Sequence, residues 1–186
     1  MRTNYQHIHK DIIIRCKNGE RNAQFELYNL YYKAMYNTSL RIVNNSDEAE
    51  DVMQESFLTA FDRLDTFREE VSFGAWLKKI VVNKSLDAIK KRKLSFELIE
   101  DVEQHLSSDK ESEDLTGDEK KQAECVKNAI FKLKDGYRIV LSLYLLEGYD
   151  HDEIAEILNI TASTSRSQLA RAKVRLIKLL KEQKQH

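Results

Sequence analysis

Apolar residues recur at spacings of three and four through the first half of the chain, which is the repeat of a helix with one buried face. The pattern predicts a short helix over residues 11–16 and a long helix with an aromatic face over residues 25–43. A third helix is expected over residues 45–64, because Asn45 is a favourable N-cap and an acidic residue follows three positions later. Ser72 can cap a fourth helix, again with one apolar stripe.

The second half of the chain shows the same helical spacing over four further stretches. Apolar stripes over residues 126–133 and 139–146 predict two helices, and Gly148 ends the second one. A short helix is expected over residues 151–158 and a longer one over residues 162–181. No strand is needed to account for the pattern.

A strongly acidic stretch separates the two halves. Residues 97–120 hold ten acidic residues and two lysines, whereas the blocks on either side are mildly basic, so the net charge of −1 hides an uneven distribution. Such a charge density disfavours a packed core. We therefore predict two domains, residues 1–95 and residues 121–186, joined by an acidic linker over residues 96–120.

Composition excludes several classes of protein. Five glycines and no proline leave few chain breakers, which favours long helices. Cys16 and Cys125 are isolated and the histidines lack metal-ligand spacing, so neither a metal site nor a cofactor is expected. There is no signal core or membrane-length apolar run, which predicts a soluble, cytoplasmic protein with no membrane insertion. Without a nucleophile–base pair or a phosphate-binding glycine loop, an enzyme with a small-molecule substrate is not expected.

Residues 150–175 follow the pattern of a helix-turn-helix. Asp150 is placed to cap the first helix, with Glu153 three positions later. Asn159 stands where the backbone of the turn is usually left-handed, and Thr161 can cap the second helix. The predicted fold class is therefore all-α: two small helical domains joined by an acidic linker, the second containing a helix-turn-helix.

The second helix of this motif is polar and basic on its exposed side. From residue 166 to residue 184 there are seven basic residues and one acidic residue. Short hydroxyl and amide side chains near its start can meet base edges, and arginines can bind guanine or phosphates. The alternative interpretation is a solvated surface helix with a basic tail.

Two further stretches in the first domain have candidate chemistry. Residues 72–93 combine Trp76 with a basic run, a combination that can hold single-stranded DNA, although Trp76 also fits a core position and the run could be a solvated helix end. Residues 47–57 form an acidic helix face with Gln54, which could bind a basic partner or be an ordinary helix start.

These three stretches, in this order, resemble the ECF (extracytoplasmic function) sigma factors of the sigma-70 family. Residues 49–61 are similar to the family's polymerase-binding helix, residues 73–93 to its promoter-melting helix, and residues 133–176 to its domain 4. The promoter-melting stretch has the family's spaced pattern at Trp76, Asn83, Asp87 and Arg92. The family usually has proline at the position of Lys134 and glycine at those of Asn159 and Ser163, which affects the placement of the recognition helix.

The resemblance implies a sigma factor that directs transcription initiation by recognising the minus-35 and minus-10 promoter elements and assisting DNA melting. Its expected partners are core RNA polymerase and promoter DNA, and an anti-sigma factor is common in the family. The implied polymerase contacts are Asp51, Gln54 and Glu55. The implied minus-35 contacts are Thr164, Arg166, Ser167, Gln168 and Arg171, with Lys173 and Arg175 on phosphates. The implied minus-10 contacts are Thr66, Phe67 and Arg68 in a loop for a flipped base, together with Asn83, Lys84, Lys91 and Arg92.

Two other functions fit parts of the sequence. A stand-alone helix-turn-helix regulator would read DNA as a palindrome, but no obvious dimerisation domain is present and the first half of the chain would have no role. A helical protein-interaction module, whose basic helices never meet DNA, would bind its partner without sensitivity to salt.

Overall fold

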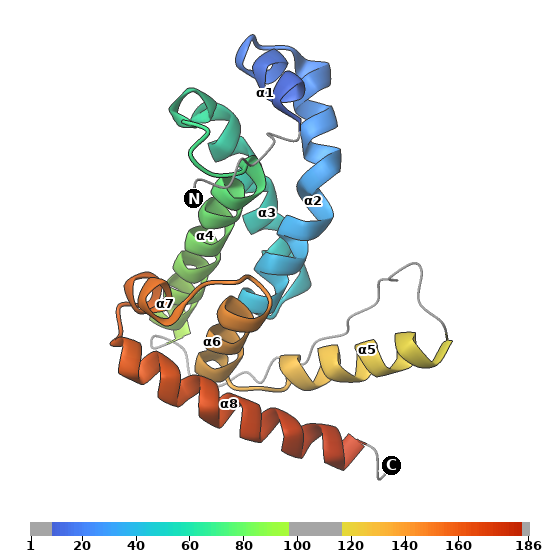
Figure 1. The fold of residues 1–186 in the computed structure, drawn as a ribbon, viewed down its shortest axis with the longest axis vertical. Coiled ribbons are helices and arrows are strands. Elements are labelled where there is room, and N and C mark those ends of the chain that lie inside the picture. The colour runs from blue at the N-terminus through green and yellow to red at the C-terminus, as the bar shows by residue number, and fades with distance from the viewer. Residues whose placement is uncertain (1–8, 97–116, 184–186) are drawn as a thin grey trace, which may run out of the picture. The chain divides into compact units, whose positions relative to one another are not determined.

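The computed structural model describes residues 9–96 and 117–183, and every regular element in this part of the chain is helical (Figure 1). The chain divides into an N-terminal unit, Met1–Gln104, and a C-terminal unit, His105–His186. None of the helices in the described ranges has both the length and the apolar character needed to cross a membrane.

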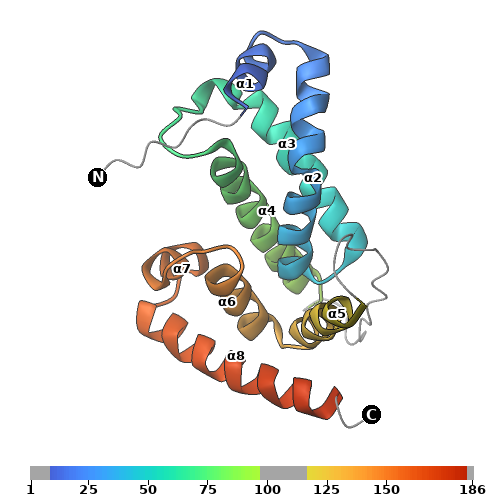
Figure 2. The same ribbon diagram turned by 45° about the vertical axis from the view of Figure 1, so that its right-hand side comes forward.

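The N-terminal unit is built on three long helices that pack side by side (Figures 1 and 2). Its elements are α1 (Lys10–Lys17), α2 (Arg21–Val43), α3 (Ser46–Asp62), the short 3₁₀ helix η1 (Leu64–Thr66) and α4 (Phe73–Phe96). Helices α2, α3 and α4 each contact the other two, and α1 packs against the start of the bundle. This arrangement gives α4 one buried face and leaves the opposite face exposed.

Short polar residues define the helix ends in this unit. The side chain of Asn45 accepts a hydrogen bond from the backbone N–H of Glu48 (2.9 Å), and Ser72 Oγ accepts one from the N–H of Ala75 (3.2 Å). Both predicted caps are therefore confirmed. Asn44 ends α2 in the left-handed region (φ 59°), which an asparagine tolerates better than most residues. The chain therefore reverses between α2 and α3 within two residues.

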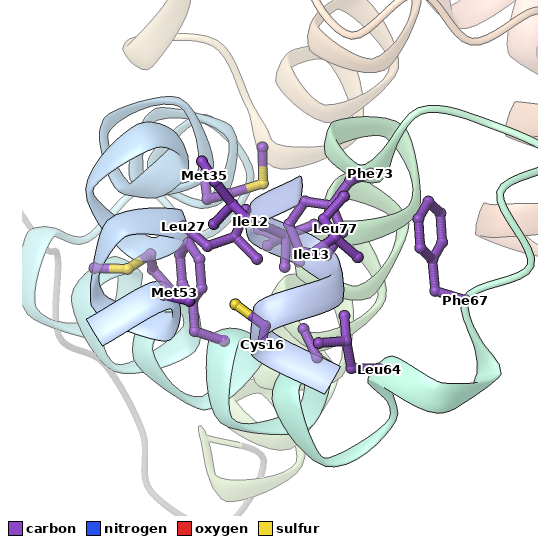
Figure 3. Close-up of a cluster of buried hydrophobic side chains, with 14 residues drawn as sticks. Ile12, Ile13, Cys16, Leu27, Met35, Met53, Leu64, Phe67, Phe73 and Leu77 are labelled. Atoms are coloured by element: carbon purple, nitrogen blue, oxygen red, sulfur yellow. The ribbon is translucent and has the colours of Figure 1, made fainter. Parts of the chain in front are cut away.

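Apolar and aromatic side chains from all the helices of the N-terminal unit form its core. Figure 3 shows Leu27 of α2 and Leu77 of α4 converging near the middle of this cluster, and both are fully buried. Burying one such side chain contributes about 1.5–3 kcal/mol. Phe73 at the start of α4 contacts Phe67 edge-on, with ring centroids 5.7 Å apart. The connection between α3 and α4 is thus attached to the core by an aromatic side chain.

Helices α2 and α4 approach closely through small side chains. Ser85 Oγ donates to Ser39 Oγ (3.1 Å), and both residues are buried. At Gly74, an added Cβ would lie 2.9 Å from the ring of Tyr31, so α4 begins too close to α2 for a side chain at that position. These contacts fix where α4 lies on α2.

The C-terminal unit contains α5 (Gly117–Phe131), α6 (Asp135–Leu145), α7 (His151–Leu158) and α8 (Ala162–Gln183). Helix α8 packs against the other three (Figure 2). The buried apolar residues of the C-terminal unit are Ala129, Ile130, Leu133, Ile139, Val140, Leu141, Leu143, Ile154, Leu169 and Ala172. This core is small, and several polar side chains are buried beside it.

Arg138 is the largest fully buried side chain of the C-terminal unit, and no local sequence pattern indicated its role. Its guanidinium donates to the Leu133 carbonyl (3.1 Å) and to Asp135 Oδ1 (2.8 Å), so it joins the end of the α5–α6 connection to the first turn of α6. A buried charge is tolerated only when it is paired in this way.

The predicted fold class is confirmed: two small helical units, the second with a helix-turn-helix. Residues 97–116, most of the predicted acidic linker, lie outside the described residues. Helix α5 begins at Gly117, inside the range 96–120 assigned to the linker. Three members of the predicted apolar stripes are 36–47% exposed and so are not part of the core, namely Val126, Tyr144 and Leu146.

Candidate nucleic-acid interface

Helix α7 starts with a complete capping box. Asp150 Oδ1 accepts hydrogen bonds from the backbone N–H groups of Asp152 (2.9 Å) and Glu153 (2.8 Å), and Glu153 Oε2 accepts one from the N–H of Asp150 (2.8 Å). Burial raises the pKa of the neighbouring Tyr149 phenol to about 12, with Glu147 and Glu153 adding to the shift, so the phenol stays neutral at physiological pH. The start of the helix-turn-helix is therefore fixed by hydrogen bonds from backbone N–H groups to the carboxylates of Asp150 and Glu153.

The turn between α7 and α8 has the predicted geometry. Asn159 lies in the left-handed region (φ 53°, ψ 50°), and the next residue, Ile160, donates its N–H back to the Ala155 carbonyl (3.0 Å). Thr161 Oγ1 accepts from the backbone N–H of Thr164 (3.0 Å), so the predicted cap of α8 is confirmed. The turn is short, and the backbone N–H groups of Asn159 and Ile160 and the Thr161 hydroxyl are hydrogen-bonded.

Helix α8 presents most of the predicted minus-35 residues to solvent. Thr164, Arg166, Ser167, Arg171, Lys173 and Arg175 are exposed and Gln168 is half-buried. Two hydroxyls also bond locally: Thr164 to Thr161 (2.8 Å) and Ser167 to the Ser163 carbonyl (3.0 Å). Within the described residues no ion pair involves the four cations of this set, so their charge is available to a partner.

One side of α8 also borders a shallow apolar hollow. Tyr137, Ala170 and Val174 form its apolar part, and Arg171, Arg175 and Lys178 surround it. Arg171 and Arg175 therefore lie at the edge of an apolar surface.

In the N-terminal unit, five of the predicted contact residues line one groove between α3 and α4: Asp51 and Glu55 of the polymerase set, and Lys84, Lys91 and Arg92 of the minus-10 set. Its lining consists of Glu48, Asp51, Val52, Glu55, Lys84, Asp87, Ala88, Lys91 and Arg92. Across it, Lys84 Nζ lies 3.5 Å from Glu55 Oε2. The sequence assigned these two residues to different partners, and the structure pairs them with each other.

Arg92 has an internal role that was not predicted. Its guanidinium donates to the Val43 carbonyl (3.1 Å) and to Glu48 Oε2 (3.0 Å), and both side chains of this ion pair are largely buried. Arg92 therefore ties α4 to the junction between α2 and α3. By contrast, Asn83 and Lys91 on the same helix are exposed.

The predicted polymerase contacts are all exposed on α3. Gln54 Nε2 donates to Glu50 Oε1 (3.3 Å), one turn earlier, and Asp51 lies on the groove described above. The first turns of α3 thus present an acidic surface with one amide, as the sequence indicated.

The loop assigned to a flipped base contains one residue that the structure places in the core. Phe67 is buried and packs against Trp76, with ring centroids 5.3 Å apart, so its ring does not face solvent for a base to contact. Arg68 and Thr66 are exposed, although the Thr66 hydroxyl bonds to the Arg63 carbonyl (2.7 Å). Trp76 is half-buried, consistent with the core position that its spacing allowed.

No cluster of His, Cys, Asp and Glu side chains suited to a metal ion occurs among residues 9–96 and 117–183. The two cysteines are unpaired, and burial raises the pKa of the Cys16 thiol to about 11.

Comparison with protein families gives two matches along the chain. Residues 27–94 match sigma-70 region 2, and residues 123–176 match sigma-70 region 4. The two matches together cover well over half of the chain and correspond to α2–α4 and to α5–α8.

Characterised relatives match over most of their length. The chain is 29% identical over 182 residues to the ECF RNA polymerase sigma factor SigW of Bacillus subtilis, covering 93% of this chain and 97% of SigW. It is 30% identical over 148 residues to the RNA polymerase sigma factor SigV of the same organism, covering 79% of this chain and 85% of SigV.

Solved structures share the fold. The sigma factor RpoE from Bartonella quintana, in complex with the anti-sigma factor NepR, matches with a TM-score of 0.64 at 23% identity, over 84% of this chain and 95% of RpoE. CnrH, in complex with the cytosolic domain of CnrY, matches with a TM-score of 0.54 at 20% identity, over 92% of this chain and 96% of CnrH.

Proposed function

The chain belongs to the ECF sigma factors of the sigma-70 family and acts in transcription initiation, and from this premise we propose how its two units divide promoter recognition. The C-terminal unit reads the minus-35 element as duplex DNA. The N-terminal unit binds core polymerase and holds the melted minus-10 strand. The observation that carries the proposal is the row of exposed, unpaired cations on α8, directly after a capped and tightly bonded turn.

For the minus-35 element, α8 enters the major groove by its N-terminal turns. Arg166 and Arg171 are exposed and long enough to reach base edges, and each can bind a guanine with two hydrogen bonds. Lys173 and Arg175 follow further along the helix and bind phosphates, which adds affinity without sequence preference.

For the minus-10 element, Asn83 and Lys91 on the exposed face of α4 and Arg68 in the loop before it hold the strand. Phe67 supports this loop from the core side. Arg92 acts indirectly, because its bonds to Val43 and Glu48 fix the angle of α4.

For core polymerase, the contact surface is the acidic face of α3 with Asp51, Gln54 and Glu55. Electrostatic complementarity of this kind favours a basic surface on the partner and speeds association. Sigma factors are in general non-catalytic recognition subunits, so RNA synthesis stays with the polymerase and this chain works beside it in the cytoplasm. By analogy with the RpoE–NepR complex, we assign an anti-sigma factor as a further partner.

Promoter-dependent transcription tests this proposal. The full chain is mixed with core polymerase, and transcription is measured on a genomic promoter library. We expect specific transcripts from wild type and a loss of at least about ten-fold for R166A/R171A, because each bidentate contact is worth about 1–3 kcal/mol. Lys132→Ala, an exposed cation of the same unit outside the proposed interface, should transcribe as wild type does.

Failure to associate with core polymerase would contradict the proposal. A polymerase-independent footprint with twofold symmetry would instead favour a stand-alone regulator. For the N-terminal unit, Lys91→Ala should reduce promoter opening while Lys33→Ala, an exposed lysine on α2, should not.

A further inference from the structure

His151, the first residue of α7, links all three helices of the helix-turn-helix region. Its Nδ1 lies 2.9 Å from Ser165 Oγ of α8, within hydrogen-bond distance. Its ring stacks on Tyr144 of α6, with centroids 4.5 Å apart and an interplanar angle of 22°. A single half-buried side chain therefore contacts the helix before it and the recognition helix after it.

Ser165 is the buried residue of α8 nearest to its start. It is fully buried and shares one helical face with Leu169 and Ala172, at spacings of four and three. The two apolar residues anchor the middle of α8, whereas the anchor of its first turn is a hydroxyl whose partner is His151. Because Thr164 and Arg166 flank Ser165 directly, the rotation of α8 at Ser165 sets the direction in which both leave the helix.

We propose that His151 is a positioning residue for promoter recognition, which fixes the orientation of the first turns of α8 through Ser165 and does not itself contact DNA. The inference rests on the proposed function, in which those turns read the minus-35 element. A buried hydroxyl that loses its partner is costly, so loss of the His151 ring nitrogen should favour a small shift of α8 that gives Ser165 another partner. A small rotation of α8 then misplaces the base contacts.

The chemistry of the pair suggests a matched set of variants. H151F keeps a ring to stack on Tyr144 but leaves the Ser165 hydroxyl without its partner. S165A removes the hydroxyl and adds no bulk. The double variant H151F/S165A removes both polar groups of this pair, and removing both partners of a hydrogen bond costs less than removing one. Glu156→Gln, an exposed change on the same helix, is the control.

The experiment uses holoenzyme reconstituted from core polymerase and the full chain, with a promoter that wild type selects from a genomic library. Affinity is measured for this promoter and for the same fragment with its minus-35 element replaced, and the ratio of the two affinities is the readout. We expect the ratio to fall about ten-fold for H151F but only about three-fold for S165A and for H151F/S165A. Glu156→Gln should keep the wild-type ratio.

Three results would overturn the proposal. Equal losses on the two fragments would mean that His151 only affects folding, which thermal melts of each variant would show as well. If the binding of H151F depends on salt less than that of wild type, by about the amount that one phosphate contact contributes, then His151 touches the DNA backbone. A double variant as weak as H151F would mean that Ser165 does not transmit the effect. If wild-type holoenzyme recognised no promoter at all, the proposed function would fail, which is a separate outcome.

Discussion

The N-terminal unit is stabilised mainly by apolar and aromatic packing, whereas the C-terminal unit relies more on single polar side chains at helix ends. In the first, Leu27, Leu77 and their neighbours form one continuous core. In the second, a buried arginine and a histidine–serine pair lie beside a small core, and an exposed capping box begins α7. The two units therefore position α4 and α8, each of which has one exposed face, by different kinds of contact.

This difference follows from size. A small unit buries less apolar surface, so each specific polar contact makes up a larger share of its stability. A polar contact is also directional, and it fixes the angle of a helix better than one more methyl group does. Directional contacts are useful where base edges must be met within a fraction of an ångström, and less so where a strand is held by its phosphates.

The largest effect should come from the core of the N-terminal unit. Leu77→Ala removes a fully buried side chain and should lower the free energy of unfolding by about 2–5 kcal/mol, measured by urea denaturation. Leu58→Ala is the matched control, because Leu58 is 65% exposed and its loss should cost less than about 0.5 kcal/mol. Similar costs for the two leucines would contradict the described core.

The next effect should come from the buried arginine of the C-terminal unit. Asp135→Ala removes the carboxylate that pairs with Arg138 at 2.8 Å and should cost about 2–3 kcal/mol of stability, by the same measurement. Asp135→Asn keeps a side-chain acceptor and should cost less. If Asp135→Ala is as stable as wild type, polar contacts matter less in this unit than we infer.

A third prediction separates the two kinds of DNA contact that we propose for α8. Arg171→Ala should weaken binding of the holoenzyme to its own promoter by about 1–3 kcal/mol, with a loss of preference at one base position. Lys173→Ala should weaken binding to all sequences alike and reduce the salt dependence by about one phosphate contact. Affinity titrations at several salt concentrations distinguish the two. The reverse pattern would exchange the roles of these residues.

The smallest effect should come from the ion pair across the groove of the N-terminal unit. Glu55 is 67% exposed and Lys84 31% exposed, so Glu55→Ala should change stability by less than about 1 kcal/mol. If Glu55 binds core polymerase, the same variant should nevertheless weaken holoenzyme assembly, measured by fluorescence titration. A large loss of stability would show instead that the pair is structural.

Local patterns allowed the helices and their caps to be predicted. Asn45, Asp150, Asn159 and Thr161 act through neighbours within a few residues, so spacing alone revealed them. Most of the residues proposed to contact the minus-35 element could likewise be placed on the exposed side of α8, because a helix presents a repeating surface.

Contacts distant in sequence could not be predicted in this way. Arg92 bonds to Glu48, which is 44 residues away, and a basic run at a helix end is equally typical of a DNA contact. Phe67 lies in a polar connection, and only the folded chain shows that its ring turns into the core. His151 and Ser165 looked like ordinary helix residues, because their pairing depends on the angle between two helices.

The hydroxyl contact between Ser39 and Ser85 favours one position of α4 along α2. Sliding α4 along α2 by one turn would separate the two hydroxyls. Ser85 would keep its bond to the Val81 carbonyl within α4 (2.7 Å), whereas Ser39 would lose its partner, so the pair favours one register of the two helices. The exposed face of α4, on which strand contacts are proposed, should therefore keep a fixed height relative to α2.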